Sequence, residues 1–222
     1  LQIQSNHIQM SYYFMFVILF FVGAYFEDAY RKKELPHFFK ASGVLALAAV
    51  VGVCINISNL YHTYEYSKET MRGKSELKQE GAAASQTSSG LDRDYITNWS
   101  YGIGETLTLL VPNVKGGGSG STMSQSEAAM AKANPMYNGI YSQLPQYFGE
   151  QPWTAGPVYV GAFVMFLFVL GCFIVKGPLK WALLGATIFS ILLSWGKNFM
   201  GLTDFFIDYV PMYNKFRAVS SI

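Results

Sequence analysis

The run YYFMFVILFFV, at residues 12–22, contains aromatic and aliphatic side chains and no charge. The uncharged segment around it covers about residues 8–26. A helix that crosses a bilayer needs roughly 20 apolar residues, at a rise of about 1.5 Å per residue. This stretch therefore predicts a membrane-spanning helix near the start of the sequence.

Three further segments lack charge over a similar length, at about 41–60, 155–175 and 181–196. The last is the shortest, but Lys180 and Lys197 flank it and can reach the headgroup region. A buried core helix is the alternative for any one of them, yet the 222 residues include little soluble sequence to bury four. We predict an all-α polytopic membrane protein with four transmembrane helices, in two pairs at 1–60 and 155–196.

The composition excludes several other classes of protein. Charged residues make up 14% of the chain, whereas soluble domains average about 25%. A disordered chain would combine low hydrophobicity with high net charge, but here 51% is hydrophobic and the net charge is +2. The chain has no basic stripe, so no nucleic-acid partner is expected.

The connections between the paired segments predict the orientation in the membrane. Arg31, Lys32, Lys33 and Lys40 lie in the first connection, and the turn at 175–180 holds two more lysines. Short loops rich in lysine and arginine stay in the cytoplasm. The expected location is a bacterial cytoplasmic membrane.

This orientation leaves residues 1–10, 61–154 and 197–222 outside. The region 61–154 is mixed in composition and predicted to be partly disordered, with flexible tracts at 79–90 and 113–123 that are rich in small and polar residues. The ends, at Leu1 and Ile222, suggest an interior fragment of a longer polytopic protein.

The segment 197–222 is predicted to contain an amphipathic helix at the outer interface. Its apolar residues recur at helical spacing, and are Leu202, Phe205, Phe206 and Tyr209. Asp204 and Asp208 share the other side, where they form either a solvated face or, as a weaker alternative, a site for a divalent cation. No other metal or cofactor is expected.

Several short runs, taken in order and spacing, resemble the YfhO family of large bacterial membrane proteins, in the form common in Bacteroidetes. These runs are SNHIQMSYY (5–13), TYEY (63–66), MRGKSEL (71–77), GLDRDYI (90–96), WSYGIGE (99–105), YFGEQPWTAGPVY (147–159) and YNKFR (213–217). The resemblance implies an enzyme similar to the GT-C glycosyltransferases. Such enzymes move a sugar from a polyprenyl-phosphate carrier to an acceptor glycan or polymer of the cell envelope.

The resemblance also implies that the catalytic acid lies in an outer loop upstream of Leu1, so its identity is unknown here. Cations at the membrane surface would stabilise the phosphate leaving group. Arg217 is the first candidate for binding the donor phosphate, because it follows an aromatic interfacial segment. The family often continues with proline and a second arginine, where this chain has Ala218 and Val219. Arg72 and Lys74 are the next candidates, with a solvated loop as their alternative.

Other polar and aromatic residues are weaker candidates. His7 could assist proton transfer where the first span begins, although a locally bonded histidine is the simpler interpretation. Glu65 and Glu105 are possible assisting acids, and each is more simply structural. Three aromatic side chains are candidates for stacking on a sugar or acceptor, with interfacial anchoring as the alternative, and these are Trp99, Tyr101 and Trp153.

Two other functions remain open on the sequence alone. A polytopic transporter or lipid flippase would place ionisable residues or broken helices at mid-membrane, and the predicted spans carry no charge. A non-catalytic envelope scaffold would use the outer region only to bind partners. Membrane lipids are expected as partners in every case.

Overall fold

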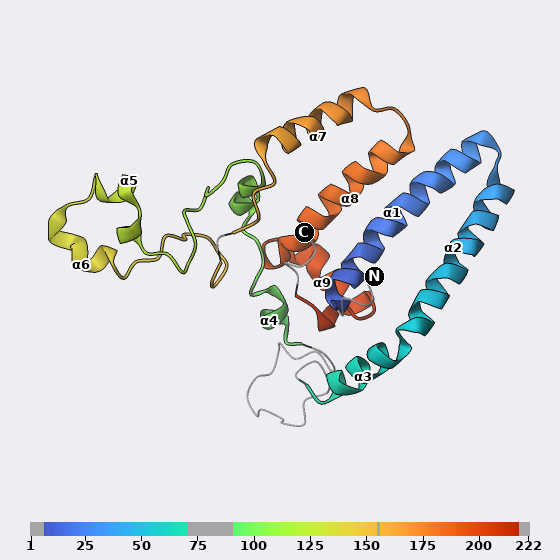
Figure 1. Ribbon diagram of the computed structural model, residues 1–222, viewed down its shortest axis with the longest axis horizontal. Coiled ribbons are helices and arrows are strands. Elements are labelled where there is room, and N and C mark those ends of the chain that lie inside the picture. Colours follow the sequence, from blue (N-terminus) through green and yellow to red (C-terminus); the bar gives the residue numbers. More distant parts are fainter. Residues whose placement is uncertain (1–6, 71–90, 155, 218–222) are drawn as a thin grey trace.

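The computed structural model describes residues 7–70, 91–154 and 156–217, which form helices and irregular segments with isolated β-bridges but no strand (Figure 1). The longest helices are α1 (Ile8–Lys32), α2 (Leu35–Ile55) and α8 (Pro178–Ser194). The shorter α-helices are α3 (Ile57–Lys68), α4 (Arg93–Thr97), α5 (Glu127–Met130), α6 (Asn138–Tyr141), α7 (Ala162–Ile174) and α9 (Met200–Tyr209). The 3₁₀ helices are η1 (Ile103–Leu109), η2 (Met123–Gln125), η3 (Pro135–Tyr137), η4 (Gly196–Phe199) and η5 (Tyr213–Lys215).

The structure supports two or three membrane-spanning elements among the described residues, so the prediction of four is wrong. α1 and α2 are each long and apolar enough to cross a bilayer. α8 qualifies only together with η4 and α9, as a third span that is bent by 109°. The chain is therefore helical and of membrane type, with fewer spans than the hydropathy pattern predicts.

The predicted span at 155–175 contains only a short helix, α7. Its 13 residues extend about 20 Å, which is less than the roughly 30 Å of the hydrocarbon core. Gly156 and Gly161 have φ angles of +77° and +108°, and Pro157 lies between them. These residues keep the chain out of the α-helical conformation until Ala162.

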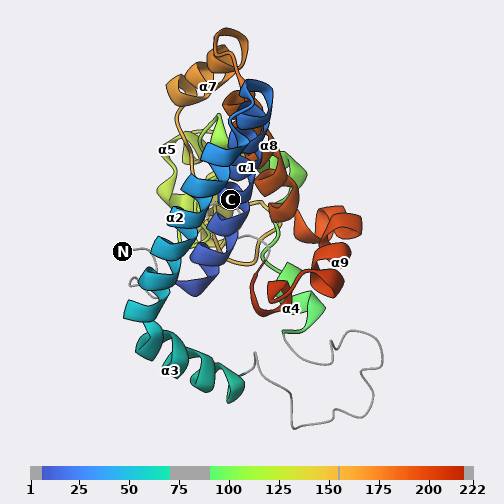
Figure 2. The same cartoon turned by 90° about the vertical axis from the view of Figure 1, so that its right-hand side faces the viewer.

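α1 and α8 pack side by side in opposite directions (Figures 1 and 2). Phe189 lies between Phe16 and Phe20, with ring centroids 5.7 and 5.6 Å away. A Cβ on Gly185 would lie 3.1 Å from the Phe20 ring, so the glycine allows the close approach of the two helices. The α1–α2 and α7–α8 turns lie at the same end of the helices, which we call the basic end (Figure 1).

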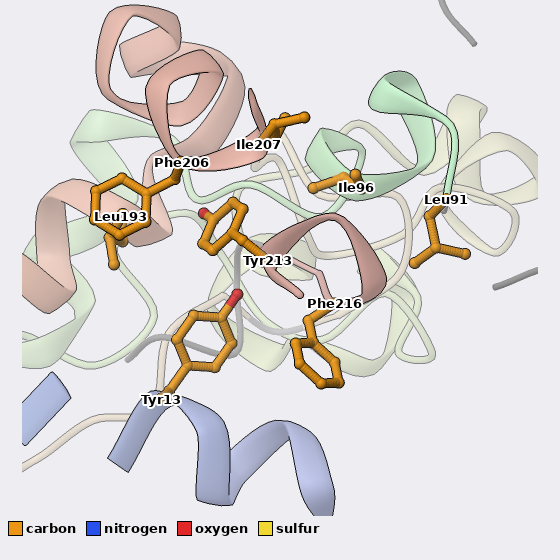
Figure 3. Packing of buried hydrophobic residues seen from close by; sticks show 8 residues of the cluster. All are labelled: Tyr13, Leu91, Ile96, Leu193, Phe206, Ile207, Tyr213 and Phe216. Carbon is orange, nitrogen blue, oxygen red and sulfur yellow. The ribbon is translucent and has the colours of Figure 1, made fainter. Parts of the chain in front are cut away.

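A cluster of buried side chains lies at the other end, where α1 begins and α8 ends. We call it the Tyr213 cluster, and Figure 3 shows Tyr213 in the middle of it. Its members come from five different parts of the chain and are Tyr13, Leu91, Ile96, Leu193, Phe206, Ile207, Tyr213 and Phe216. The cluster joins the C-terminal segment and the 91–97 segment to the start of α1.

The bend between α8 and α9 lies at Trp195 and Gly196, where Gly196 has a φ angle of +39°. The carbonyl of Ser194 accepts a hydrogen bond of 2.9 Å from the Tyr101 backbone N–H. The carbonyl of Gly196 accepts one of 2.8 Å from the Thr203 hydroxyl. Carbonyl groups that the helix break would leave free are therefore bonded within the protein.

The side chains that α9 exposes are not all those that the predicted interfacial helix would expose. Phe206 is buried against Phe16 and Phe189, rather than facing lipid. Phe205 and Tyr209 are exposed and lie with ring centroids 5.3 Å apart. The aromatic residues of this segment thus divide between the protein core and the surface, because the bend turns one side of α9 toward α1 and α8.

Residues 111–154 form an arm that projects away from the long helices (Figure 1). Backbone hydrogen bonds join its two sides, from Gly117 N–H to the Gln146 carbonyl at 3.0 Å and from Phe148 N–H to the Lys115 carbonyl at 2.8 Å. The tract 113–123, predicted to be flexible, is therefore paired with 144–148 over much of its length. The other predicted flexible tract, 79–90, lies outside the described residues.

Glycine at position 116 is required by this pairing, so we expect Gly116→Ala to disrupt the arm. A Cβ there would lie 1.9 Å from the Gln146 carbonyl oxygen, and the φ angle is +85°. Such strain costs about 1–3 kcal/mol. Amide hydrogen exchange at Gly117 and Phe148 should become roughly 5- to 150-fold faster. Gly120→Ala is the matched control, because nothing lies within 4 Å of an added Cβ. Equal effects of the two substitutions would contradict the pairing.

Candidate functional site

Arg217 lies where the C-terminal segment meets the start of α1. Its backbone carbonyl accepts hydrogen bonds of 3.2 Å from Gln9 Nε2 and 3.0 Å from the Tyr13 hydroxyl. Both donors are in the first two turns of α1, and Phe216 is buried in the Tyr213 cluster. The backbone at Arg217 is therefore held at the end of the helices opposite the basic end.

Two aromatic rings hold the guanidinium group of Arg217. Its Cζ atom lies 4.9 Å from the ring centroid of Tyr95 and 5.4 Å from that of Trp99. Nη2 also donates a hydrogen bond to the Tyr95 hydroxyl. Tyr95 and Trp99 are four residues apart, and α4 with the turn after it presents both to the same cation.

α4 is positioned by a cap and an ion pair. The Asp92 carboxylate accepts a hydrogen bond of 2.8 Å from Asp94 N–H at the start of the helix. Arg93 forms ion pairs with both Asp204 and Asp208 of α9. The predicted aspartate pair therefore binds an arginine of the chain, and the residues described by the structure include no group of three ligands that could hold a metal ion.

Arg217 has no carboxylate within ion-pair distance among the described residues, in contrast to Arg31 and Arg93. A guanidinium group has five N–H donors, of which the Tyr95 hydroxyl uses one. The side chain is partly exposed. The site therefore offers a positioned cation with donors available to an anion such as a phosphate.

His7 lies near this site but makes no side-chain hydrogen bond to it among the described residues. It is the residue before α1, its side chain makes no capping hydrogen bond, and it is exposed. Gln9, two residues later, contacts the Arg217 carbonyl. The N–H groups at the start of α1 add positive potential near Arg217, and no acidic residue in the first turn offsets it.

Glu105 is fully buried and occupies a structural position at the base of the arm. One carboxylate oxygen accepts a hydrogen bond of 2.7 Å from Gly102 N–H. The other accepts one of 3.0 Å from Glu150 N–H and a second from the Tyr147 hydroxyl. Burial and the neighbouring carboxylate raise the pKa of Tyr147. A Cβ on Gly149 would lie 1.6 Å from Glu105, so the glycine makes room for the carboxylate.

The other predicted residues are not brought to the Arg217 site. Glu65 pairs with Lys68 on α3 at 2.7 Å, in an exposed ion pair. Tyr101 is buried beside the α8–α9 bend, and burial raises the pKa of its hydroxyl. Trp153 is 73% exposed. Of the three predicted aromatic side chains, Trp99 alone contacts Arg217. The other predicted phosphate-binding residues, Arg72 and Lys74, lie outside the described residues.

Sequence reasoning missed the residues that hold Arg217, namely Tyr95, Gln9 and Tyr13. A local signal existed for Tyr95, since it precedes Trp99 by one helical turn and both rings can face one cation. Gln9 and Tyr13 lie about 200 residues from Arg217, and no local pattern connects them.

No protein-family model, curated protein or solved structure matches this chain. The function must therefore be inferred from the residues themselves.

We expect the Tyr147 hydroxyl to stabilise the base of the arm by satisfying Glu105. In Tyr147→Phe, the buried Glu105 oxygen loses one of its two donors and the Gln151 N–H loses its acceptor, at a cost of about 1–3 kcal/mol. Amide exchange at Gly102 and Glu150, whose N–H groups bind the same carboxylate, should accelerate. Tyr137→Phe is the matched control, because it removes a hydroxyl from a half-exposed ring elsewhere in the arm. Unchanged exchange in Tyr147→Phe would refute the role of this hydrogen bond.

Proposed function

We propose that the chain is part of a multi-pass membrane glycosyltransferase and that Arg217 binds the phosphate of its polyprenyl-phosphate sugar donor. The observation that carries the proposal is the guanidinium group held across Tyr95 and Trp99, with no carboxylate partner among the described residues. A lipid-linked sugar carries an anionic phosphate at the membrane surface. A fixed cation there lowers the energy of the charge that develops on the leaving phosphate.

The end of the helices at which Arg217 lies supports this assignment. Arg217 lies at the start of α1, whereas the two basic turns lie at the opposite end (Figure 1). If these turns face the cytoplasm, as short basic loops do, Arg217 lies on the outer side. The exposed rings of Phe205 and Tyr209 suit the interface at that side.

Three carboxylates of this region are already bound, which favours phosphate binding over proton transfer as the role that these groups support. Glu105 is buried with both oxygens bonded, and Asp204 and Asp208 bind Arg93. None of these groups is a free general base. We therefore assign the chain donor binding and leaving-group stabilisation, with transfer to an envelope glycan or polymer as the reaction it serves.

A transporter or flippase is the second candidate, and the broken α8–α9 element is the observation that favours it. Transporters use such breaks to bind ions or substrates through free backbone groups. Here the Ser194 and Gly196 carbonyls are bonded to Tyr101 and Thr203. The break is therefore closed by the chain itself, which supports the enzyme over the transporter.

The proposal predicts that Arg217→Ala weakens binding of polyprenyl phosphate to the full-length protein. Loss of charge-assisted hydrogen bonds of about 1.5–3 kcal/mol corresponds to a roughly 10- to 150-fold higher Kd. Binding can be measured by microscale thermophoresis in detergent, and sugar transfer from a polyprenyl-phosphate donor should fall in parallel. Arg217→Lys should restore part of the affinity, because it keeps the charge and loses the planar fork.

Lys215→Ala is the matched control, since it removes the same charge two residues earlier, and it should leave the Kd within about twofold of the wild type. Equal affinity of the wild-type protein for polyprenyl phosphate and for neutral polyprenol would contradict the proposal. An unchanged Kd in Arg217→Ala would remove Arg217 from the site.

A further inference from the structure

A groove of about 380 Å³ lies between α1 and α8 near the basic end. Leu19, Phe20 and Trp181 form its larger walls, and three small residues leave its floor open. These small residues are Gly23, Ala24 and Ala182. The volume falls within the roughly 300–1,000 Å³ of small-molecule sites.

The groove is confined to this end because aromatic side chains close the rest of the α1–α8 contact. Toward the Tyr213 cluster, Phe16, Phe20 and Phe189 fill the space between the helices. The gap that remains beside them measures only about 20 Å³. A further helix would need a continuous groove along both helices, so this short groove fits a flexible chain better.

Two cations contact residues that line the groove. Glu27, which lines it, forms an ion pair with Arg31, and the Arg31 side chain is 73% exposed. Lys180 Nζ lies 4.7 Å from the ring centroid of Trp181 and donates a 3.0 Å hydrogen bond to the Cys172 carbonyl. No carboxylate lies within ion-pair distance of Lys180 among the residues that the structure describes.

The surrounding charge is also positive. Residues 27–34 carry three cations and three carboxylates, and residues 176–180 add two lysines and no acid, which leaves the two turns together with a net charge of +2. Basic pockets between membrane helices at the cytoplasmic side bind anionic headgroups. Exposed Trp181 beside the groove is typical of a side chain at the membrane–water interface.

We infer that this groove is a binding site for an anionic phospholipid, which places an acyl chain between α1 and α8 and its phosphate at Arg31 and Lys180. The Glu27–Arg31 pair is exposed and therefore weak, so Arg31 can share its donors with a phosphate. The site lies at the opposite end of α1 from Arg217. It does not depend on the proposed glycosyltransferase function.

Native mass spectrometry of the detergent-purified full-length protein tests this site, with phosphatidylglycerol as the probe and phosphatidylcholine as the neutral comparison. The wild type should bind phosphatidylglycerol more tightly. Arg31→Gln and Lys180→Gln should each weaken that binding about fivefold at low salt, because each removes one cation near the phosphate.

Gly23→Leu tests the groove independently of charge, by filling the space for the acyl chain. Gly43→Leu on α2 is the matched control, since nothing lies within 4 Å of an added Cβ at either glycine. We expect phosphatidylglycerol binding to fall at least tenfold in Gly23→Leu and to stay within twofold of wild type in Gly43→Leu. Equal affinity for the two lipids, or unchanged binding in Gly23→Leu, would overturn the inference.

Discussion

The packing of Tyr213 against the first turns of α1 is the interaction on which the rest of the structure depends. The Tyr213 ring is fully buried, with its centroid 6.1 Å from that of Tyr13 and 5.3 Å from that of Phe206. Its hydroxyl has no hydrogen-bond partner among the described residues, and burial raises its pKa to about 12. Aromatic contact therefore holds the Tyr213 ring itself, and the hydrogen bonds from Gln9 and Tyr13 to the Arg217 carbonyl add to it in holding the C-terminal segment on α1. Arg217 follows directly, so this contact also sets the position of the cation.

Polar groups that are buried near this cluster are satisfied by segments distant in sequence. The Ser100 hydroxyl accepts a hydrogen bond of 2.9 Å from Lys197 N–H. Trp195 Nε1 donates one of 2.8 Å to the Thr106 hydroxyl. These bonds join the 97–106 segment to the α8–α9 bend, as Glu105 joins it to the base of the arm. An unpaired buried group would cost about 1–3 kcal/mol, so the bend and this segment stabilise each other.

Local patterns predicted that α1, α2 and α8 are helices, because hydropathy over about 20 residues is a property of neighbours in sequence. The bounds of the second span were wrong, since α2 covers Leu35–Ile55 and the predicted span 41–60 crosses the break before α3. The same pattern failed at 155–175, where Gly156 and Gly161 adopt positive φ angles and Pro157 disfavours helix before it, features that an average over apolar side chains does not register. Arg217 was predicted from its place after an aromatic segment. Its ring partners, and the pairing of Asp204 and Asp208 with Arg93, depend on contacts across more than 100 residues, which no local pattern contains.

The placement of Arg217 depends most directly on the C-terminal segment folding back onto the start of α1. Tyr12 is half-buried beside that segment. Its hydroxyl donates a hydrogen bond of 2.9 Å to the Pro211 carbonyl, and its ring centroid lies 5.0 Å from that of Phe216. A photoreactive benzoylphenylalanine at position 12 of the full-length protein would record its neighbours by mass spectrometry of cross-linked peptides. We predict cross-links to residues 210–217. Cross-links confined to other segments would contradict the placement of Arg217 at this end of the helices.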